Sequence, residues 1–420
     1  MSHSETIAVV IRSFPSQTER FILRELFALL TAGYKLRIYA MDVNEADDGD
    51  YVARRIYPFV VELPKVNSPS VASSVIRSQL NFNIGLKRLL AHFIFCAPLG
   101  GVGSTPLWRR LRWLRWHLAH CPVGFWLAEE LQHHNVTRIH AHFGHITASI
   151  ALTAALTSGI SFSMSAHAYD IYVEPIAMRE KLLKASVVVT CTRANLEHLR
   201  NTYSEATGKT HLVYHGLLRD EVERFSNTAF GCLPFREGAT LLFVGRLIPK
   251  KGVDVLLRAL KRLRGKVRCI IVGDGPLKSN LQSLATQLGV SDCITFIGGV
   301  RHEEVAKYYA RASALVVPSV IAKDGDRDGL PNVILESAAS LLPIIASDIS
   351  GIPEFVEDGE TGLLFKAGDC DSLACAIERL LSSESLRKRV TEGAYNKLLT
   401  SFIADENAKR LGKLITGVIP

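Results

Sequence analysis

Two carboxylates stand eight positions apart in the segment DGLPNVILE, which runs from Asp328 to Glu336. Pro331 suits the first turn of a helix that continues through Glu336. The free amides at the start of such a helix favour phosphate, and carboxylates on either side of a bound anion accept hydrogen bonds from sugar and ribose hydroxyls. Acids at a helix start also complement the helix dipole, which is the commoner reason for their presence.

A pair of cations follows a predicted strand in FVGRLIPKKGVDVLLRAL (243–260). Arg246 stands at the end of the strand and Lys251 at the start of the next helix. Arginine offers a planar fork and lysine a compact charge to phosphate oxygens, so the two together suit a diphosphate. Surface cations at the start of a helix are an equally good interpretation of this spacing.

Glycines mark a third strand end, in IVGDGPL (271–277), where they allow a ligand to approach the backbone closely. This is not a dinucleotide-binding fingerprint, because Lys278 occupies the place of the third glycine in GxGxxG. The segment ATGKT (206–210) resembles the end of a P-loop, but Tyr203 stands where the first glycine belongs.

Histidines cluster at two strand ends of the first half. RIHAHFGHITASI contains His140, His142 and His145, and SAHAYDIY contains His167 and Asp170. No carboxylate or thiolate stands near the three histidines in the sequence, and strand alternation gives only His140 and His142 a common face. The sequence therefore predicts no metal site. A hydrogen-bonded loop histidine is an equal interpretation of His167.

Short apolar runs alternate with amphipathic stretches along most of the chain, which predicts parallel sheets covered by helices on both faces. A length of 420 residues favours two domains. The segment 216–238 breaks the alternation and is predicted to be a linker. We expect doubly wound domains over 1–222 and 223–400, and a terminal helix over 401–420 that returns to the first. The predicted strands are 7–12, 35–40, 136–142, 161–167, 187–191 and 211–215, then 240–245, 267–273, 294–298, 314–319 and 343–347.

The net charge of +8 is concentrated in one region. No acid occurs between Glu62 and Glu129, a stretch with eight lysines and arginines. Within it, LWRRLRWLRWHLAH (107–120) places leucines at helical spacing among tryptophans and arginines, as in a helix that lies on an anionic membrane surface. A buried helix with a basic rim is equally compatible. The eight scattered cysteines, and the absence of a signal peptide or spanning segment, predict a cytoplasmic protein.

Four segments of the second half resemble, in order, the donor-binding half of retaining glycosyltransferases of family 4, which have the GT-B fold. They are GRLIPKKG, GDGP, DGLPNVILE and SDISGIPEFVEDGETGLLF (347–365), and they cover most of residues 240–370. In the first half, FPSQTERFILREL (14–26), IHAHFGH and FSMSAHAYDIY resemble the subgroup that builds exopolysaccharides, including colanic-acid-type transferases. Residues 60–130 match nothing in that subgroup, as expected of a region that handles the acceptor.

The resemblance implies two domains facing a central cleft, and a role for each matching residue. Arg246 and Lys251 would bind a diphosphate, and Glu336 a ribose. Asp328 would lie near the donor hexose, where the family usually has the longer Glu, and His167 beside the donor sugar. The implied catalytic residues are His167, Asp328, Arg246 and Lys251. The implied donor-binding residues are Gly245, Arg246, Lys251, Gly273, Gly275, Asp328, Gly329, Leu330, Pro331, Asn332, Val333 and Glu336, and the implied acceptor-binding residues are Phe14, Glu19, His142 and Asp170.

The resemblance further implies a metal-independent hexosyl transfer without a cofactor, from a nucleotide diphosphate sugar to a saccharide or an undecaprenyl-linked oligosaccharide. It implies no nucleic-acid partner. An anionic membrane surface would be contacted through residues 77–127, which would hold the enzyme at the inner face of the plasma membrane. The alternatives are a nucleotide-sugar epimerase, a glycoside hydrolase that uses Asp328 and Glu336, and a basic membrane-surface protein without chemistry.

Overall fold

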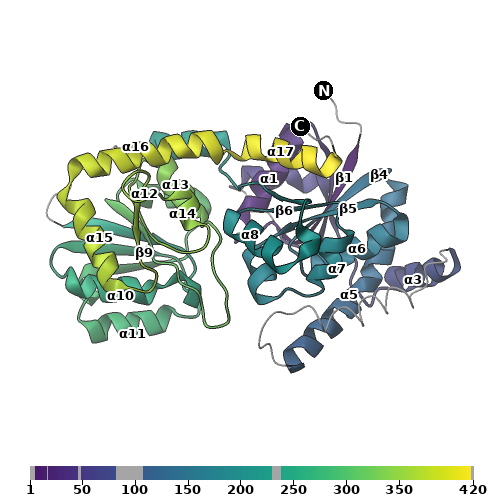
Figure 1. The fold of residues 1–420 in the computed structure, drawn as a ribbon, viewed down its shortest axis with the longest axis horizontal. Helices are drawn as coiled ribbons and strands as arrows, with labels where there is room; N and C mark the ends of the chain where they lie inside the picture. Colours follow the sequence, from purple (N-terminus) through teal and green to yellow (C-terminus); the bar gives the residue numbers. More distant parts are fainter. Residues whose placement is uncertain (1–4, 17, 46–48, 82–106, 229–237, 418–420) are drawn as a thin grey trace. The chain divides into compact units, whose positions relative to one another are not determined.

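A computed structural model describes residues 5–16, 18–45, 49–81, 107–228 and 238–417. The chain divides into two compact units, the first formed by Met1–Val213 with Asp405–Pro420 and the second by Tyr214–Ala404 (Figure 1). The sequence-based division placed the boundaries at 222 and 400. Among the described residues, no helix combines the length and the apolar character needed to cross a membrane.

The first unit is built on a seven-stranded sheet with the order β3-β2-β1-β4-β5-β6-β7, in which every pair is parallel. Its interior strand β1 is buried from Ile7 to Ile11, as expected for a parallel strand with helices on both faces. The strands are β1 (Thr6–Phe14), β2 (Lys35–Val43), β3 (Val60–Glu62), β4 (Val136–His142), β5 (Ser161–Ala166), β6 (Val187–Thr190) and β7 (Thr210–Leu212).

Helices enclose this sheet. The largest hydrophobic cluster of the unit joins α5 and α6 to one face of β1, β4 and β5. The terminal helix α17 also belongs to this unit, where Gly412 lies so close to Tyr34 that a Cβ would come within 2.3 Å of the Tyr34 ring. The helices are α1 (Arg20–Thr31), α2 (Tyr51–Ile56), α3 (Pro69–Asn81), α5 (Leu107–His133), α6 (Ile146–Ser158), α7 (Met178–Lys184), α8 (Arg193–Thr202) and α17 (Ala404–Thr416).

The second unit repeats this architecture with a six-stranded parallel sheet of order β10-β9-β8-β11-β12-β13. One core lies between the sheet and helices that include α10, α11 and α15, and another between the sheet and helices that include α9, α12, α13 and α16. The strands are β8 (Ala239–Val244), β9 (Val267–Val272), β10 (Ile294–Gly298), β11 (Ala314–Val317), β12 (Ile344–Ser347) and β13 (Leu363–Phe365), and the helices are α9 (Arg219–Thr228), α10 (Val253–Arg262), α11 (Lys278–Leu288), α12 (His302–Tyr309), α13 (Asn332–Ala339), α14 (Ile352–Phe355), α15 (Cys370–Ser382) and α16 (Glu384–Ser401).

The predicted strands all overlap observed strands, which confirms the doubly wound α/β class. Two strands were missed, β3 and β13, because each has three residues and shows no recognisable pattern. The prediction of a linker over 216–238 is wrong for residues 219–228. Helix α9 forms there and buries Val222 and Phe225 in the core of the second unit.

The basic region is only partly covered by the described residues. The helix predicted over 107–120 is confirmed as the first part of α5. Residues 82–106, which belong to the segment 77–127 assigned to the membrane, lie outside the described residues. Membrane binding through this segment stays a prediction.

Candidate functional site

The loops that follow β8 and β9 meet at the carboxyl edge of the second sheet, where ligands of such sheets bind. The Gly245 amide donates to the Val272 carbonyl at 3.0 Å, and the Gly273 amide to the Gly298 carbonyl at 2.8 Å. At Gly273 φ is +143°, and a Cβ would lie 1.9 Å from the Gly245 carbonyl oxygen. Gly275 is similarly tight, since a Cβ there would lie 2.6 Å from the Leu247 carbonyl oxygen. Only glycine allows these two loops to touch.

The two predicted cations differ in their surroundings. Arg246 lies two residues after the end of β8 and is exposed to solvent. Lys251 closes a short turn before α10, and its Nζ lies 2.7 Å from Oδ2 of Asp328. The Ser319 hydroxyl donates to the same Asp328 oxygen at 2.9 Å. The structure therefore brings two of the predicted residues, Lys251 and Asp328, into direct contact.

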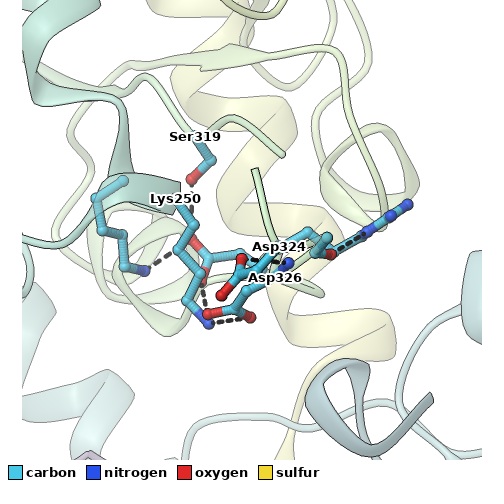
Figure 2. Close-up of polar contacts among 8 residues, drawn as sticks. Lys250, Ser319, Asp324 and Asp326 are labelled. Carbon is cyan, nitrogen blue, oxygen red and sulfur yellow. Dashed lines mark hydrogen bonds and ion pairs between the residues drawn. The ribbon is translucent and has the colours of Figure 1, made fainter. Parts of the chain in front are cut away.

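A second ion pair stands beside the first and was missed from the sequence. Lys250 Nζ lies 3.0 Å from Oδ1 of Asp326 and 3.8 Å from Oδ1 of Asp328. Figure 2 shows Lys250, Ser319, Asp324 and Asp326 gathered at this place, where the Asp326 amide also donates to Asp324 Oδ1 at 3.1 Å. The Lys-Lys dipeptide and the alternating acids of DGDRD were the available signals, but neither shows which lysine meets which acid.

The backbone fixes the position of these lysines. The Val320 amide donates to the Lys250 carbonyl at 2.8 Å, which ties the turn before α10 to the segment that follows β11. Gly252 completes the turn with φ of +59°, and a Cβ there would lie 1.9 Å from the Pro318 carbonyl oxygen. The lysines therefore come from a turn with little freedom to move.

Asp328 is ionised despite its burial. Its side chain is 11% exposed, and burial by itself raises the pKa of this carboxyl. The positive charges of Lys251 and Lys250, with hydrogen bonds from Lys251 and Ser319, outweigh burial and hold the pKa of Asp328 below its ordinary value. The site thus combines two ammonium groups with a permanent carboxylate.

Glu336 belongs to a different network. It lies on α13, is 5% exposed, and accepts a hydrogen bond from the Tyr309 hydroxyl at 3.0 Å. Pro331 is buried and directly precedes the helix, while Asn332 and Val333 in its first turn are half-buried, as are Gly329 and Leu330 before it. The start of α13 therefore offers backbone amides next to Asp328, as the segment DGLPNVILE predicts.

His167 follows β5 in the first unit and is 6% exposed. Its ring centroid lies 4.4 Å from that of Phe143, 5.0 Å from that of Phe21 and 6.0 Å from that of His142. The His167 amide donates to Oδ1 of Asp170 at 2.9 Å. Both the ring and the backbone of His167 are thus held by neighbouring residues.

The other predicted residues of the first unit have separate environments. Phe14 ends β1 and is fully buried, with its ring centroid 6.1 Å from that of Tyr57. Glu19 precedes α1 and is half-buried. Burial raises the pKa of Glu19, although Arg12 and His142 oppose the shift. Since Phe14, His142 and Asp170 have at most 1% exposed surface in this structure, an acceptor reaches them only if neighbouring residues move.

Asp170 interacts electrostatically with a buried lysine, Lys181, that gave no signal in the sequence. Lys181 Nζ donates to the carbonyls of Gly144 (2.7 Å), His145 (3.0 Å) and Ile176 (2.9 Å). The Asp170 carboxylate accepts hydrogen bonds from the backbone amides of Gly144 and His167. Burial raises the pKa of Asp170 and lowers the pKa of Lys181, and the charge of each offsets the shift of the other. The pair fastens the loops that follow β4 and β5.

The sequence of the second unit matches a known family. Residues 233–397 match the family described as glycosyl transferases group 1. The amylovoran biosynthesis glycosyltransferase AmsK of Erwinia amylovora is 34% identical over 165 residues, which cover 39% of this chain and 40% of AmsK. The GDP-mannose-dependent alpha-(1-6)-phosphatidylinositol monomannoside mannosyltransferase of Mycobacterium tuberculosis is 38% identical over 149 residues, 34% of this chain and 39% of that protein. Each match thus spans about two fifths of the relative's length.

The fold matches over the whole chain. The crystal structure of HepE from Anabaena in complex with UDP and glucose superposes with a TM-score of 0.67, covers 98% of this chain and 100% of HepE, and is 16% identical in sequence. This likeness concerns the fold alone. The chain therefore has the GT-B fold, and its residues 233–397 match the family described as glycosyl transferases group 1.

Proposed function

We propose that this chain transfers a hexosyl group, with its anomeric configuration retained, from a nucleotide diphosphate sugar to a saccharide or a lipid-linked oligosaccharide. The observation that carries the proposal is the contact of Lys251 with Asp328 beside Arg246, at the carboxyl edge of a sheet within the matched family segment. AmsK is named an amylovoran biosynthesis glycosyltransferase, and LpsE of Rhizobium meliloti, 34% identical over 166 residues, a lipopolysaccharide core biosynthesis glycosyltransferase. These names support a role in the synthesis of a bacterial surface or extracellular polysaccharide.

The charged side chains of the site suggest how a diphosphate would bind. In the free protein Lys251 is neutralised by Asp328. An incoming diphosphate competes for Lys251 and also attracts Arg246, while Lys250 stays close enough to keep Asp328 ionised. Asp328 can then accept hydrogen bonds from the hydroxyls of the donor sugar. Glu336, which accepts a hydrogen bond from the Tyr309 hydroxyl, would receive the ribose hydroxyls.

Bond cleavage builds negative charge on the departing diphosphate. Arg246, Lys251 and the backbone amides from Leu330 to Val333 are proposed to stabilise it, and this requires neither a metal ion nor a cofactor. His167 and Glu19 are proposed to be the contributions of the first unit, to the transferred sugar and to the acceptor respectively.

The test removes the two cations one at a time. We expect Arg246→Ala and Lys251→Ala each to lower turnover about a hundredfold, or about 3 kcal/mol of transition-state stabilisation, by analogy with the loss of one oxyanion donor. Lys266→Ala is the matched control, because Lys266 is exposed and pairs with Glu378 on the surface of the same unit. Unchanged turnover in both Arg246→Ala and Lys251→Ala would exclude the assignment.

The enzymatic alternatives predict different products. A retaining hydrolase needs an acid and a nucleophile about 5 Å apart that act as one pair, whereas Asp328 and Glu336 belong to separate networks with Lys251 and Tyr309. An epimerase would isomerise the donor sugar when no acceptor is present. Anomeric NMR of the product and incubation of the donor alone distinguish these activities from retaining transfer.

A further inference from the structure

A buried polar cluster lies on one face of the first sheet. His140 and His142 come from β4, Ser163 and Ser165 from β5, and Glu25 from α1. Strand alternation puts the two histidines on the face opposite to Ile139 and Ala141, which belong to the hydrophobic core under α5 and α6. The cluster thus contains a carboxylate, which the sequence around the histidines lacks.

The hydrogen bonds of His140 identify its tautomer. Nδ1 lies 2.9 Å from the Ser163 hydroxyl and Nε2 2.9 Å from the Ser165 hydroxyl. The Ser163 hydroxyl donates its hydrogen to the Ile139 carbonyl at 3.2 Å, so it accepts from Nδ1–H of His140. Nε2 therefore carries the lone pair.

His142 has a different and less satisfied environment. It is 0% exposed, and its Nε2 lies 3.0 Å from Oε1 of Glu25. Neither ring nitrogen of His142 makes a hydrogen bond of acceptable geometry within the described part of the chain. Buried polar nitrogens of this kind are rare in folded proteins. A hydrogen-bonded core explains His140 but leaves His142 unexplained.

We propose that Glu25, His140 and His142 form a binding site for a divalent transition-metal ion, with Zn²⁺ as the best fit. Each offers one ligand atom, and these atoms lie within 4.8 Å of one another. Zinc bonds of about 2.0–2.1 Å hold tetrahedral ligand atoms roughly 3.3 Å apart, close to the spacing of the Glu25 and His142 pair. Two imidazoles and one carboxylate favour zinc over magnesium or calcium, and a fourth position is left for water.

The surroundings of the cluster suit an ion. The Nδ1–H of His140 is held by Ser163, and such a second contact orients histidines that bind metals. Glu19, which interacts electrostatically with His142, has a buried oxygen without a hydrogen bond in the described chain. Together with Glu25 it balances the two positive charges of the ion. A bound ion would join α1 to β4, and metal binding there can be measured without assaying the proposed transfer reaction.

The test measures metal directly on the full-length protein. Purified protein is analysed for zinc by mass spectrometry, stripped with a chelator, and titrated with Co²⁺. We expect one ion per chain, visible absorption of four-coordinate cobalt, its displacement by Zn²⁺, and a higher midpoint of thermal unfolding with Zn²⁺ than without it.

Substitutions of the proposed ligands and of Ser163 test where the ion binds. We expect His142→Ala to abolish Co²⁺ absorption, Glu25→Gln to weaken Co²⁺ binding at least tenfold, and Ser163→Ala to weaken it about 10- to 100-fold through loss of the orienting contact. Glu25→Gln and Ser163→Ala change the side-chain volume little, so these two variants should fold even if His142→Ala does not. The control is His134→Ala, because His134 is exposed in the turn after α5, where its Nε2 lies 3.1 Å from Oε1 of Glu130.

Two results would overturn the proposal. One is wild-type protein that neither contains zinc nor develops cobalt absorption at one ion per chain. The other is cobalt absorption that persists unchanged in Glu25→Gln and in Ser163→Ala, since the ion would then lie elsewhere. Activity is not needed for either measurement, so the outcome does not depend on whether the chain transfers a sugar.

Discussion

Asp328 interacts with two lysines at once, because Lys251 Nζ lies 2.7 Å from one carboxylate oxygen and Lys250 Nζ 3.8 Å from the other. Asp326 provides a further carboxylate for Lys250 at 3.0 Å. At the scale of single residues, the site is therefore a charge-balanced network before any substrate arrives. A diphosphate that takes over Lys251 leaves Asp328 with Lys250, so no carboxylate is left buried without a cation.

Asp328→Asn tests this network through pH. The variant keeps the side-chain shape but loses the charge, and we expect its free energy of unfolding to be about 2 kcal/mol lower at pH 7, as for a lost hydrogen bond to a charged group. The pKa of Asp328 is lower in the folded protein than its ordinary 3.8. Its contribution is therefore complete above about pH 3.8 and declines as the pH falls below that value.

The measurement is denaturant unfolding of both proteins from pH 7 to pH 3. The difference between wild type and Asp328→Asn should be constant down to about pH 4 and shrink below it. A difference that already disappears near pH 6 would mean that the lysines do not hold Asp328 in its ionised form.

At the scale of elements, Lys181 on α7 connects loops that follow two neighbouring strands. It donates to carbonyls of Gly144 and His145 after β4, and Asp170 holds the backbone of His167 after β5. Lys181→Met should lower the free energy of unfolding by about 3 kcal/mol, since three buried carbonyls then lose their charged hydrogen-bond donor. The double variant Lys181→Met/Asp170→Asn should recover part of this loss.

Tryptophan fluorescence suits this measurement, because all four tryptophans belong to the first unit, at positions 108, 113, 116 and 126. If the losses in free energy of unfolding caused by Lys181→Met and by Asp170→Asn simply summed in the double variant, Lys181 and Asp170 would not be coupled.

The sequence predicted the secondary-structure elements better than the contacts between distant residues. Apolar runs such as IAVVIR and TLLFVG showed where β1 and β8 lie, because a parallel strand buried on both faces must be apolar throughout. Lys250 and Asp326 are 76 residues apart, and Glu25 meets His142 from another element. Such pairs depend on strand order and helix placement, which periodicity does not determine. For the same reason the predicted site residues were named without their partners.

At the scale of the whole molecule, the proposed donor-binding residues all belong to the second unit. A true donor should therefore stabilise the protein, and at one hundred times its Kd it adds about 2.7 kcal/mol to the free energy of unfolding. A panel of UDP-, GDP- and ADP-sugars screened by thermal unfolding identifies the nucleotide. Hydrogen exchange should then show donor-dependent protection at 245–252, 273–277 and 328–336.

Lys251→Ala decides whether the stabilisation comes from this site. Without the Lys251 ammonium the diphosphate loses one of its two proposed cations, so the donor that raises the unfolding midpoint of the wild type should raise that of the variant much less. Lys266→Ala, whose lysine pairs with Glu378 on the surface, should respond like the wild type. If Lys251→Ala kept the full shift and the same pattern of protection, the donor would bind away from the turn before α10, and the charge network around Asp328 would serve stability alone.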